Sequence, residues 1–303
     1  MVLARCLLML GLCSLTGPAW AGLKVVATLP TLAAIGREVG GGFVDVQSLS
    51  HAAEDPHFVD PRPSLMLVLN QADVVLTNGL ELEIGWLPPL LVAARNAKIA
   101  RGGPGYVEAA QFIHPLQIPK GPIDRSMGDL HAGGNPHFLT DPERVAQIAR
   151  GLARSFATLD PAHAEAYQQQ ADAFAAQLRL FSQEQALRFR ALSPAQRQVV
   201  TYHGSLIYLL SWLDLKEIAT LEPRPGVPPD PAHVAQVLQS MRVLEAKVIV
   251  QEEYYPSTTS KTLASLAKGR WITLHGGVRF NQGERYLDFL KQITDSVYVA
   301  LAP

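Results

Sequence analysis

Apolar and polar positions along the chain follow two periods, one typical of strands and one typical of helices. Seven short β-rich runs lie at residues 23–29, 43–49, 73–77, 199–202, 216–221, 248–250 and 271–274. The segments between them place apolar residues three and four positions apart, as helices do. Strands that alternate with helices favour βαβ units. We therefore predict an α/β fold with mainly parallel sheets.

The middle of the chain predicts one long helix between two such regions. Asp141-Pro142 and Asp160-Pro161 are both typical helix starts, because aspartate caps the helix and proline fits its first position. The second helix has an apolar stripe that reaches about Leu192, roughly 45 Å of helix. We expect this rigid helix to join two αβ lobes. We expect the N-terminal lobe at residues 22–159, the linking helix at 160–192 and the C-terminal lobe at 193–303.

Two segments of the first half are less regular. A helix is expected between residues 83 and 96, but Pro88-Pro89 should kink or split it. Residues 102–134 are rich in glycine and proline and have weak periodicity. They predict a loop with at most one short strand.

The N-terminus has the pattern of a cleavable signal peptide. Arg5 supplies a positive charge, an apolar run follows, and Ala19-Trp20-Ala21 is a typical cleavage site. We expect residues 1–21 to be removed. Both cysteines, Cys6 and Cys13, lie in this segment, so a metal site in the mature chain would use His, Asp or Glu.

Charge and hydropathy narrow the class of protein further. The 26 basic residues balance 27 acidic ones, which argues against a nucleic-acid partner and a polybasic membrane patch. No later apolar run approaches the ~18 residues that span a bilayer. Leu12 argues against lipid attachment at Cys13, since that modification needs a small residue before the cysteine. We expect a soluble, exported protein.

Two loops of similar sequence each contain one histidine. Asp55-Pro56-His57-Phe58 and Asn135-Pro136-His137-Phe138 share Pro-His-Phe, and Asp-Pro follows each of them within a few residues. Proline fixes its own φ and biases the preceding residue towards an extended shape, so both loops should be stiff. They predict two ligands, His57 and His137, for one metal ion.

Further candidate ligands follow three β-rich runs of the second half: His203, His275 and the pair Glu252 and Glu253. In a parallel sheet, ligands bind beyond the carboxyl ends of the strands, so these side chains should share one edge. Three or four imidazoles, with or without one carboxylate, suit tetrahedral Zn²⁺. A site richer in carboxylates suits Mn²⁺. Four of the other histidines, at 51, 114, 163 and 233, lie in loops or first helical turns without a supporting pattern.

The chain resembles the zinc- and manganese-binding solute-binding proteins of bacterial ABC importers (cluster A-I). The resemblance covers essentially the whole mature chain. It rests on Asp55-Pro56-His57, Asn135-Pro136-His137-Phe138, Tyr202-His203, Val250-Gln251-Glu252 and the proline-rich segment 222–229. The resemblance implies two αβ lobes that clamp one metal ion, with no enzymatic activity, and docking of the loaded protein on a membrane permease.

The same resemblance implies that His57 and His137 are the ligands of the N-terminal lobe and that His203 is the first ligand of the C-terminal lobe. Many members carry an aspartate where this chain has His275. We favour His275 as the fourth ligand, with Glu252 or Glu253 next and water last. Zinc-binding members often have a histidine-rich loop before the second ligand. Only His131 represents it here, as a weaker candidate for an auxiliary metal role.

The predicted function is capture of Zn²⁺ in the periplasm and its delivery to an ABC permease of the inner membrane, by a monomer without nucleic-acid partners. Mn²⁺ is the alternative cargo, and a periplasmic metallochaperone is a further candidate partner. A manganese-binding importer subunit or a metal-dependent adhesin is the alternative function. A zinc hydrolase with Glu252 or Glu253 as general base is disfavoured, because no His-Glu-x-x-His or similar motif is present.

Overall fold

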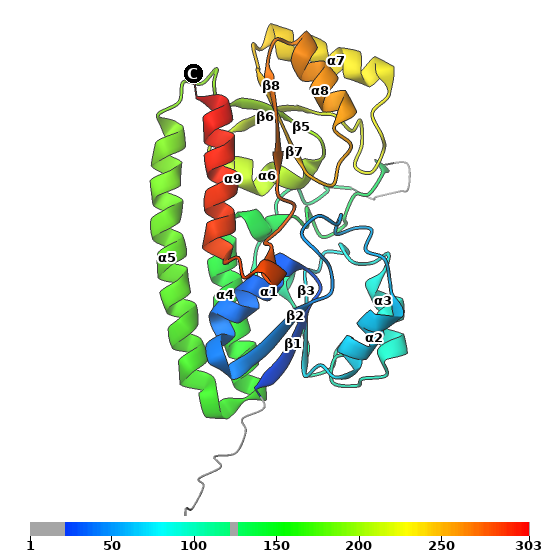
Figure 1. The fold of residues 1–303 in the computed structure, drawn as a ribbon, viewed down its shortest axis with the longest axis vertical. Coiled ribbons are helices and arrows are strands. Elements are labelled where there is room, and N and C mark those ends of the chain that lie inside the picture. Colours follow the sequence, from blue (N-terminus) through cyan, green and yellow to red (C-terminus); the bar gives the residue numbers. More distant parts are fainter. Residues whose placement is uncertain (1–21, 122–126, 303) are drawn as a thin grey trace, which may run out of the picture.

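The computed structural model describes residues 22–121 and 127–302. Its two lobes are stacked along the long axis of the molecule, and helices run beside them (Figure 1). The predicted signal peptide, residues 1–21, lies outside the described residues, and so do both cysteines.

Each lobe is built around a sheet of four parallel strands. The sheet of the first lobe has the order β2-β1-β3-β4, and the sheet of the second has the order β6-β5-β7-β8. The strands are β1 (Leu23–Ala27), β2 (Val44–Ser48), β3 (Val74–Thr77), β4 (Tyr106–Glu108), β5 (Gln198–Thr201), β6 (Lys216–Thr220), β7 (Val248–Glu252) and β8 (Arg270–Leu274). The α/β prediction with parallel sheets is confirmed, and both lobes use the same strand order.

Helices cover both faces of each sheet, as parallel sheets require. The helices are α1 (Pro30–Gly40), α2 (Pro63–Asn70), α3 (Leu87–Ala94), α4 (Pro142–Leu159), α5 (Ala164–Arg190), α6 (Ile207–Trp212), α7 (Pro231–Val243), α8 (Thr258–Leu266) and α9 (Tyr286–Leu301). The strand β3 shows why both faces must be covered, since all four of its residues are buried. Its successive residues Val74 and Val75 belong to different core clusters, one on each face of the sheet.

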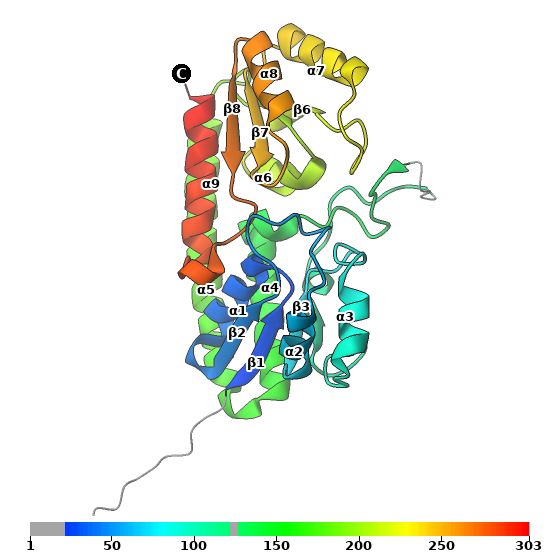
Figure 2. The ribbon, with the colours of Figure 1, turned by 45° about the vertical axis from the view of Figure 1, so that its right-hand side comes forward.

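The helix α5 joins the two lobes. It is 27 residues long, or about 40 Å. Figure 1 shows it beside α4 in the first lobe and beside α9 in the second, and in the view of Figure 2 α9 lies in front of it. Tyr167, near its start, and Phe189, near its end, are both fully buried in one core cluster. The predicted joining helix is therefore confirmed.

Two local predictions need correction. Pro88 and Pro89 do not kink a helix, because α3 begins at Leu87 and the prolines occupy its first turn. Proline is well tolerated there, since the first N–H groups of a helix have no partner within it. Asp160 does not cap a helix as Asp141 does. Instead, its Oδ2 lies 2.7 Å from Nδ1 of His163 and accepts a hydrogen bond from the Tyr167 hydroxyl.

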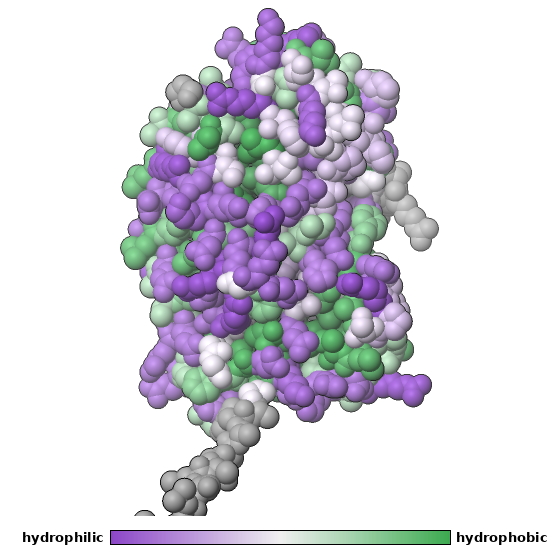
Figure 3. Space-filling view, in the orientation of Figure 1, coloured by the Kyte–Doolittle hydropathy of each residue, from purple (hydrophilic) through white to green (hydrophobic). Residues whose placement is uncertain are grey.

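One face of the molecule is polar where the two lobes meet. On the face drawn in Figure 3, hydrophilic residues predominate across the middle of the molecule, and hydrophobic residues form smaller groups on both lobes. Among the described residues, none of the helices has the length and apolar character needed to cross a membrane.

Candidate metal-binding site

The first predicted ligand, His57, is held by the residue two positions before it. Oδ1 of Asp55 accepts the His57 backbone N–H at 3.0 Å and lies 2.8 Å from Nδ1 of the ring. Burial alone would raise the pKa of Asp55, but the hydrogen bonds and charge of His57 outweigh it, and this pKa is lowered. The carboxylate therefore holds the proton of the ring on Nδ1. The other nitrogen, Nε2, is buried without a hydrogen-bond partner.

The loop of His137 repeats this turn with a different first residue. Oδ1 of Asn135 accepts the His137 backbone N–H at 3.0 Å. The Asn135 amide nitrogen donates to the carbonyl of Gly204, in the second lobe, at 2.8 Å. On the other side, Asn78 donates to the carbonyl of Pro136 at 2.9 Å. Nε2 of His137 is buried without a partner.

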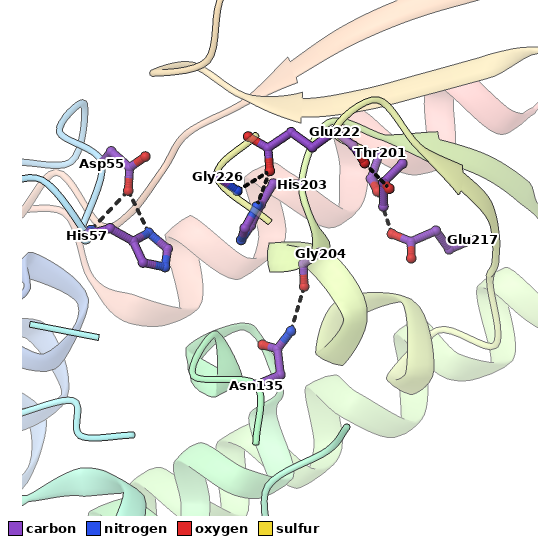
Figure 4. Close-up of polar contacts among 10 residues, drawn as sticks. Asp55, His57, Asn135, Thr201, His203, Gly204, Glu217, Glu222 and Gly226 are labelled. Carbon is purple, nitrogen blue, oxygen red and sulfur yellow. Dashed lines mark hydrogen bonds and ion pairs between the residues drawn. The ribbon is translucent and has the colours of Figure 1, made fainter. Parts of the chain in front are cut away.

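The third predicted ligand, His203, follows β5 and is held by a carboxylate from a distant loop. Its Nδ1 lies 2.7 Å from Oε2 of Glu222, and the same oxygen accepts the backbone N–H of Gly226 at 2.9 Å. Figure 4 shows this chain of contacts from Gly226 through Glu222 to His203. A carboxylate on Nδ1 fixes the tautomer and leaves Nε2 available for a metal ion.

The three histidines come together between the lobes. Their ring centroids are 5.1 Å apart for His57 and His137, 5.6 Å for His57 and His203, and 5.3 Å for His137 and His203. Each residue offers one ligand atom, and these atoms all lie within 4.8 Å of one another. A small movement would bring three imidazole nitrogens to one ion. Their assignment as ligands remains a prediction.

The environment acts differently on two of these rings. Burial, together with the neighbouring imidazoles of His57 and His203, lowers the pKa of His137 well below its usual value. Burial also opposes the charge on His203, but the hydrogen bond and charge of Glu222 outweigh it and raise its pKa. A histidine must be neutral to bind a metal ion. His137 therefore stays neutral to lower pH than His203, where a proton competes more strongly with a metal ion.

The predicted fourth ligands lie outside this group of three. Nδ1 of His275 and one oxygen each of Glu252 and Glu253 are buried without hydrogen-bond partners. Glu252 lines a cavity of about 70 Å³ together with His137. Burial raises the pKa of Glu252 to about 7. Glu253 forms an ion pair with Arg279 at 3.6 Å. The assignment of His275 as fourth ligand remains a prediction.

Of the other histidines, His163 and His233 have ring contacts away from the three predicted ligands. His163 stacks on Phe43 with ring centroids 4.2 Å apart, and His233 hydrogen-bonds through Nε2 to the carbonyl of Thr220. His131 differs, because its ring centroid lies 5.6 Å from that of His57 and its Nε2 is buried without a partner. Burial, with the charge of His57, lowers its pKa to about 4.

Asp55 and Glu222 each support one predicted ligand through a carboxylate, and neither is predicted to do so from the sequence. Asp55 could have been found, because an aspartate two residues before a histidine can accept its backbone N–H in a local turn. Glu222 has no such local signal, since it lies 19 residues after the ring that it contacts. Together they place two negative charges behind the three imidazoles.

Two parallel-sheet lobes on a joining helix, with three imidazoles converging between them, define a two-lobed metal-binding protein. The chain belongs to the family of the periplasmic zinc-uptake complex component A (ZnuA), whose model matches residues 25–300. This family comprises metal-binding substrate-binding proteins of ABC importers. The predicted class of protein and the absence of an enzymatic function are therefore confirmed.

Individual relatives are distant but cover nearly the whole chain. The iron ABC transporter substrate-binding lipoprotein MtsA of Streptococcus pyogenes serotype M1 is 22% identical over 303 residues, or 96% of this chain and 93% of MtsA. A crystal structure of ZnuA has a TM-score of 0.78 at 23% identity and covers 93% of this chain and 100% of its own. A manganese-bound periplasmic metal-binding protein of Candidatus Liberibacter asiaticus has a TM-score of 0.76 at 20% identity, with 92% and 99% covered.

Proposed function

We propose that this protein captures Zn²⁺ in the periplasm and delivers it to an ABC permease of the inner membrane. The observation that carries the proposal is the convergence of His57, His137 and His203, one ligand atom each within 4.8 Å of the others. Nitrogen ligands of borderline softness suit Zn²⁺. The family described as a zinc-uptake component supports the same cargo.

The charges around the site support a divalent ion. Asp55 and Glu222 each place a carboxylate on Nδ1 of one ligand histidine. Their two negative charges balance the two positive charges of the ion, while the imidazoles that contact it stay neutral. Such carboxylates behind ligating histidines orient the ring and raise its basicity.

The fourth ligand decides how well Mn²⁺ or iron could compete. Four imidazoles favour Zn²⁺, whereas a carboxylate in the shell makes Mn²⁺ more acceptable. Glu252 is supported by the cavity that it shares with His137 and by its charge, which acts on His203. His275 is supported by its buried, unpartnered Nδ1. The description of the family names zinc, and the names of two relatives include iron and manganese. Metal competition therefore decides which ion this protein prefers.

Delivery should involve the loops around the site more than a rotation of the lobes. The helix α5 is continuous from one lobe to the other, and it resists a hinge motion. The turns that hold His57 and His137, and the loop that holds Glu222, are the smaller elements that can move. We expect the permease to contact these loops, which belong to both lobes, when it accepts the ion.

Metal analysis and competition titration with Zn²⁺, Mn²⁺ and Fe²⁺ test the proposal. The protein should retain one Zn²⁺ per chain after purification, and His57→Ala should bind it much more weakly. His275→Ala and Glu252→Ala identify the fourth ligand, because only the variant that removes it should bind Zn²⁺ more weakly. His114→Ala is the matched control, since His114 is an exposed histidine. A wild-type protein that holds no metal after reconstitution would overturn the proposal.

A further inference from the structure

The connection between β3 and α3, residues 78–86, contacts both loops that carry the predicted ligands of the first lobe. Asn78 donates from its side chain to the carbonyl of Pro136 at 2.9 Å. Trp86 donates from Nε1 to the carbonyl of Pro56 at 3.0 Å. The two prolines are equivalent residues of the repeated Pro-His-Phe sequence, each directly before a predicted ligand. This connection, the β3–α3 turn, therefore supports the same point of each ligand loop.

The backbone of the β3–α3 turn has an uncommon conformation. Gly79, Leu80 and Glu81 have φ values of +88°, +53° and +64°. The left-handed region is unfavourable for residues with a side chain, so Leu80 and Glu81 stay there only because other contacts hold the turn. Leu80 packs closely against Gly133, where a Cβ would lie 2.6 Å from Cδ2 of Leu80. Since Gly133 lies four residues before His137, these strained residues also touch the start of that ligand loop.

The side chain that fixes this turn is the buried carboxylate of Glu83. Its Oε1 accepts the backbone N–H of Asn78 and the hydroxyl of Thr28, both at 2.6 Å. Its Oε2 accepts the backbone N–H of Gly79 at 3.2 Å. The carbonyl of the same residue accepts the backbone N–H of Trp86 at 3.2 Å. Glu83 is only 4% exposed, so water cannot replace these partners, and one residue joins the start of the turn to its end.

We propose that Glu83 is a positioning residue for both first-lobe ligands, and that its carboxylate sets the distance between His57 and His137 through the β3–α3 turn. The proposal rests on the proposed metal-binding function. Glu83 lies outside the group of three histidines and does not bind the ion itself. It acts through the two proline carbonyls, which move together when the turn moves. Ligands of a metal ion must be held to within about 0.5 Å, so a relaxed turn weakens the site.

Glu83→Gln tests the assignment, because glutamine keeps the size of the side chain but replaces one acceptor oxygen by an NH₂ group. That group cannot accept a backbone N–H, so the turn should relax. Zn²⁺ affinity, measured by competition with a chelator of known affinity, should fall roughly tenfold, as for other residues that support metal ligands. The d–d absorption bands of the Co²⁺-loaded protein should also change, since their energy and intensity depend on the ligand geometry around the ion.

Asn96→Asp is the matched control in the same lobe. The Asn96 amide donates to the carbonyls of Leu69, Asn70 and Ala72 at 3.0, 3.1 and 2.8 Å. Aspartate has the same size but cannot donate these hydrogen bonds, so this variant also breaks a network of three. The change acts on the end of α2 rather than on a ligand loop. It should lower the free energy of unfolding of the metal-free protein but leave the Zn²⁺ affinity and the Co²⁺ spectrum unchanged.

The positioning role is wrong if wild type binds Zn²⁺ and Glu83→Gln keeps either the wild-type affinity or the wild-type spectrum, or if Glu83→Gln and Asn96→Asp behave alike. Asn78→Ala and Trp86→Phe serve if Glu83→Gln does not fold. Each removes one contact between the turn and a ligand loop, so each should lower the affinity and change the spectrum. Wild-type values for both of these variants would also overturn the assignment. If wild type takes up no Zn²⁺, the proposed function itself fails.

Discussion

The loops Asp55–Phe58 and Asn135–Phe138 share a sequence pattern and a turn, but different parts of the molecule hold them. In each loop the first side chain accepts the backbone N–H of the histidine. The carboxylate of Asp55 also contacts the His57 ring, whereas the amide of Asn135 reaches Gly204 in the other lobe. The repeated turn thus places a histidine, and one differing group, an oxygen in Asp55 and an NH₂ in Asn135, decides whether the loop contacts its own histidine ring or the other lobe.

The phenylalanines after the two histidines should give the largest difference, in stability. Phe138 is fully buried and packs edge to face on Tyr208, while Phe58 is 71% exposed. Phe138→Ala should lower the free energy of unfolding by roughly 3–5 kcal/mol through loss of buried apolar contacts. Phe58→Ala should change it by less than about 0.5 kcal/mol. Urea unfolding of the metal-free proteins measures both, and equal shifts would show that the two loops are packed alike.

Removal of either histidine should have the next largest effect, in metal affinity. Structural zinc sites bind with roughly 10–16 kcal/mol over about four ligands, or about 3 kcal/mol each. His57→Ala and His137→Ala should therefore each weaken Zn²⁺ binding by roughly a hundredfold. Competition with a chelator of known affinity measures this loss. If one of the two variants binds as tightly as wild type, only one of the loops contributes a ligand.

Substitutions of Asp55 and Asn135, the first residues of the two loops, should separate the roles of these side chains. Asp55→Asn keeps an oxygen for the turn but removes the charge behind His57, so Zn²⁺ affinity should fall by roughly tenfold or more. Asn135→Asp also keeps the turn but loses the N–H donors to Gly204 and Gln117. It should lower the free energy of unfolding by about 1 kcal/mol and leave affinity nearly unchanged. Affinity titration and urea unfolding of both variants test this, and it is wrong if both variants lose affinity equally.

The smallest expected effect is a shift in pH dependence. Metal affinity should be full where all ligand histidines are neutral and should decline as pH falls. Because the pKa of His203 is raised, this decline should begin above its usual ~6.5, while His137 with its lowered pKa adds little. We expect at least a tenfold loss between pH 7.5 and pH 5. Glu222→Gln should move the decline to lower pH in a series of titrations, and an unshifted profile would exclude Glu222 as its cause.

Most of the fold could be predicted because each strand is a short apolar run bounded by turns and each lobe repeats the alternation of strand and helix. The helix α3 was misread because Trp86, just before it, provides no side-chain cap, so the sequence did not mark its start. The strand β4 is only three residues long. Its pairing with β3, rather than a periodic pattern, defines it, and pairing depends on tertiary structure.

The contacts that support the candidate site were predictable only where they are local. The turns at His57 and His137 span two residues each, so proline and the preceding polar residue indicate them directly. The contact between His203 and Glu222 joins segments on either side of β6 and depends on the packed loop. The position of His131 beside His57 depends on the fold of a glycine-rich segment, which gives no periodic signal.

The burial of α5 in a core shared by both lobes has a consequence for cooperativity. One continuous cluster includes Val25 of the first lobe, Val199 of the second, and Tyr167 and Phe189 of the helix between them. Neither lobe can unfold without exposing apolar surface that the helix buries against the other. The metal-free protein should therefore melt in one transition rather than two. An ion bound between the lobes then stabilises the entire chain by its own binding free energy.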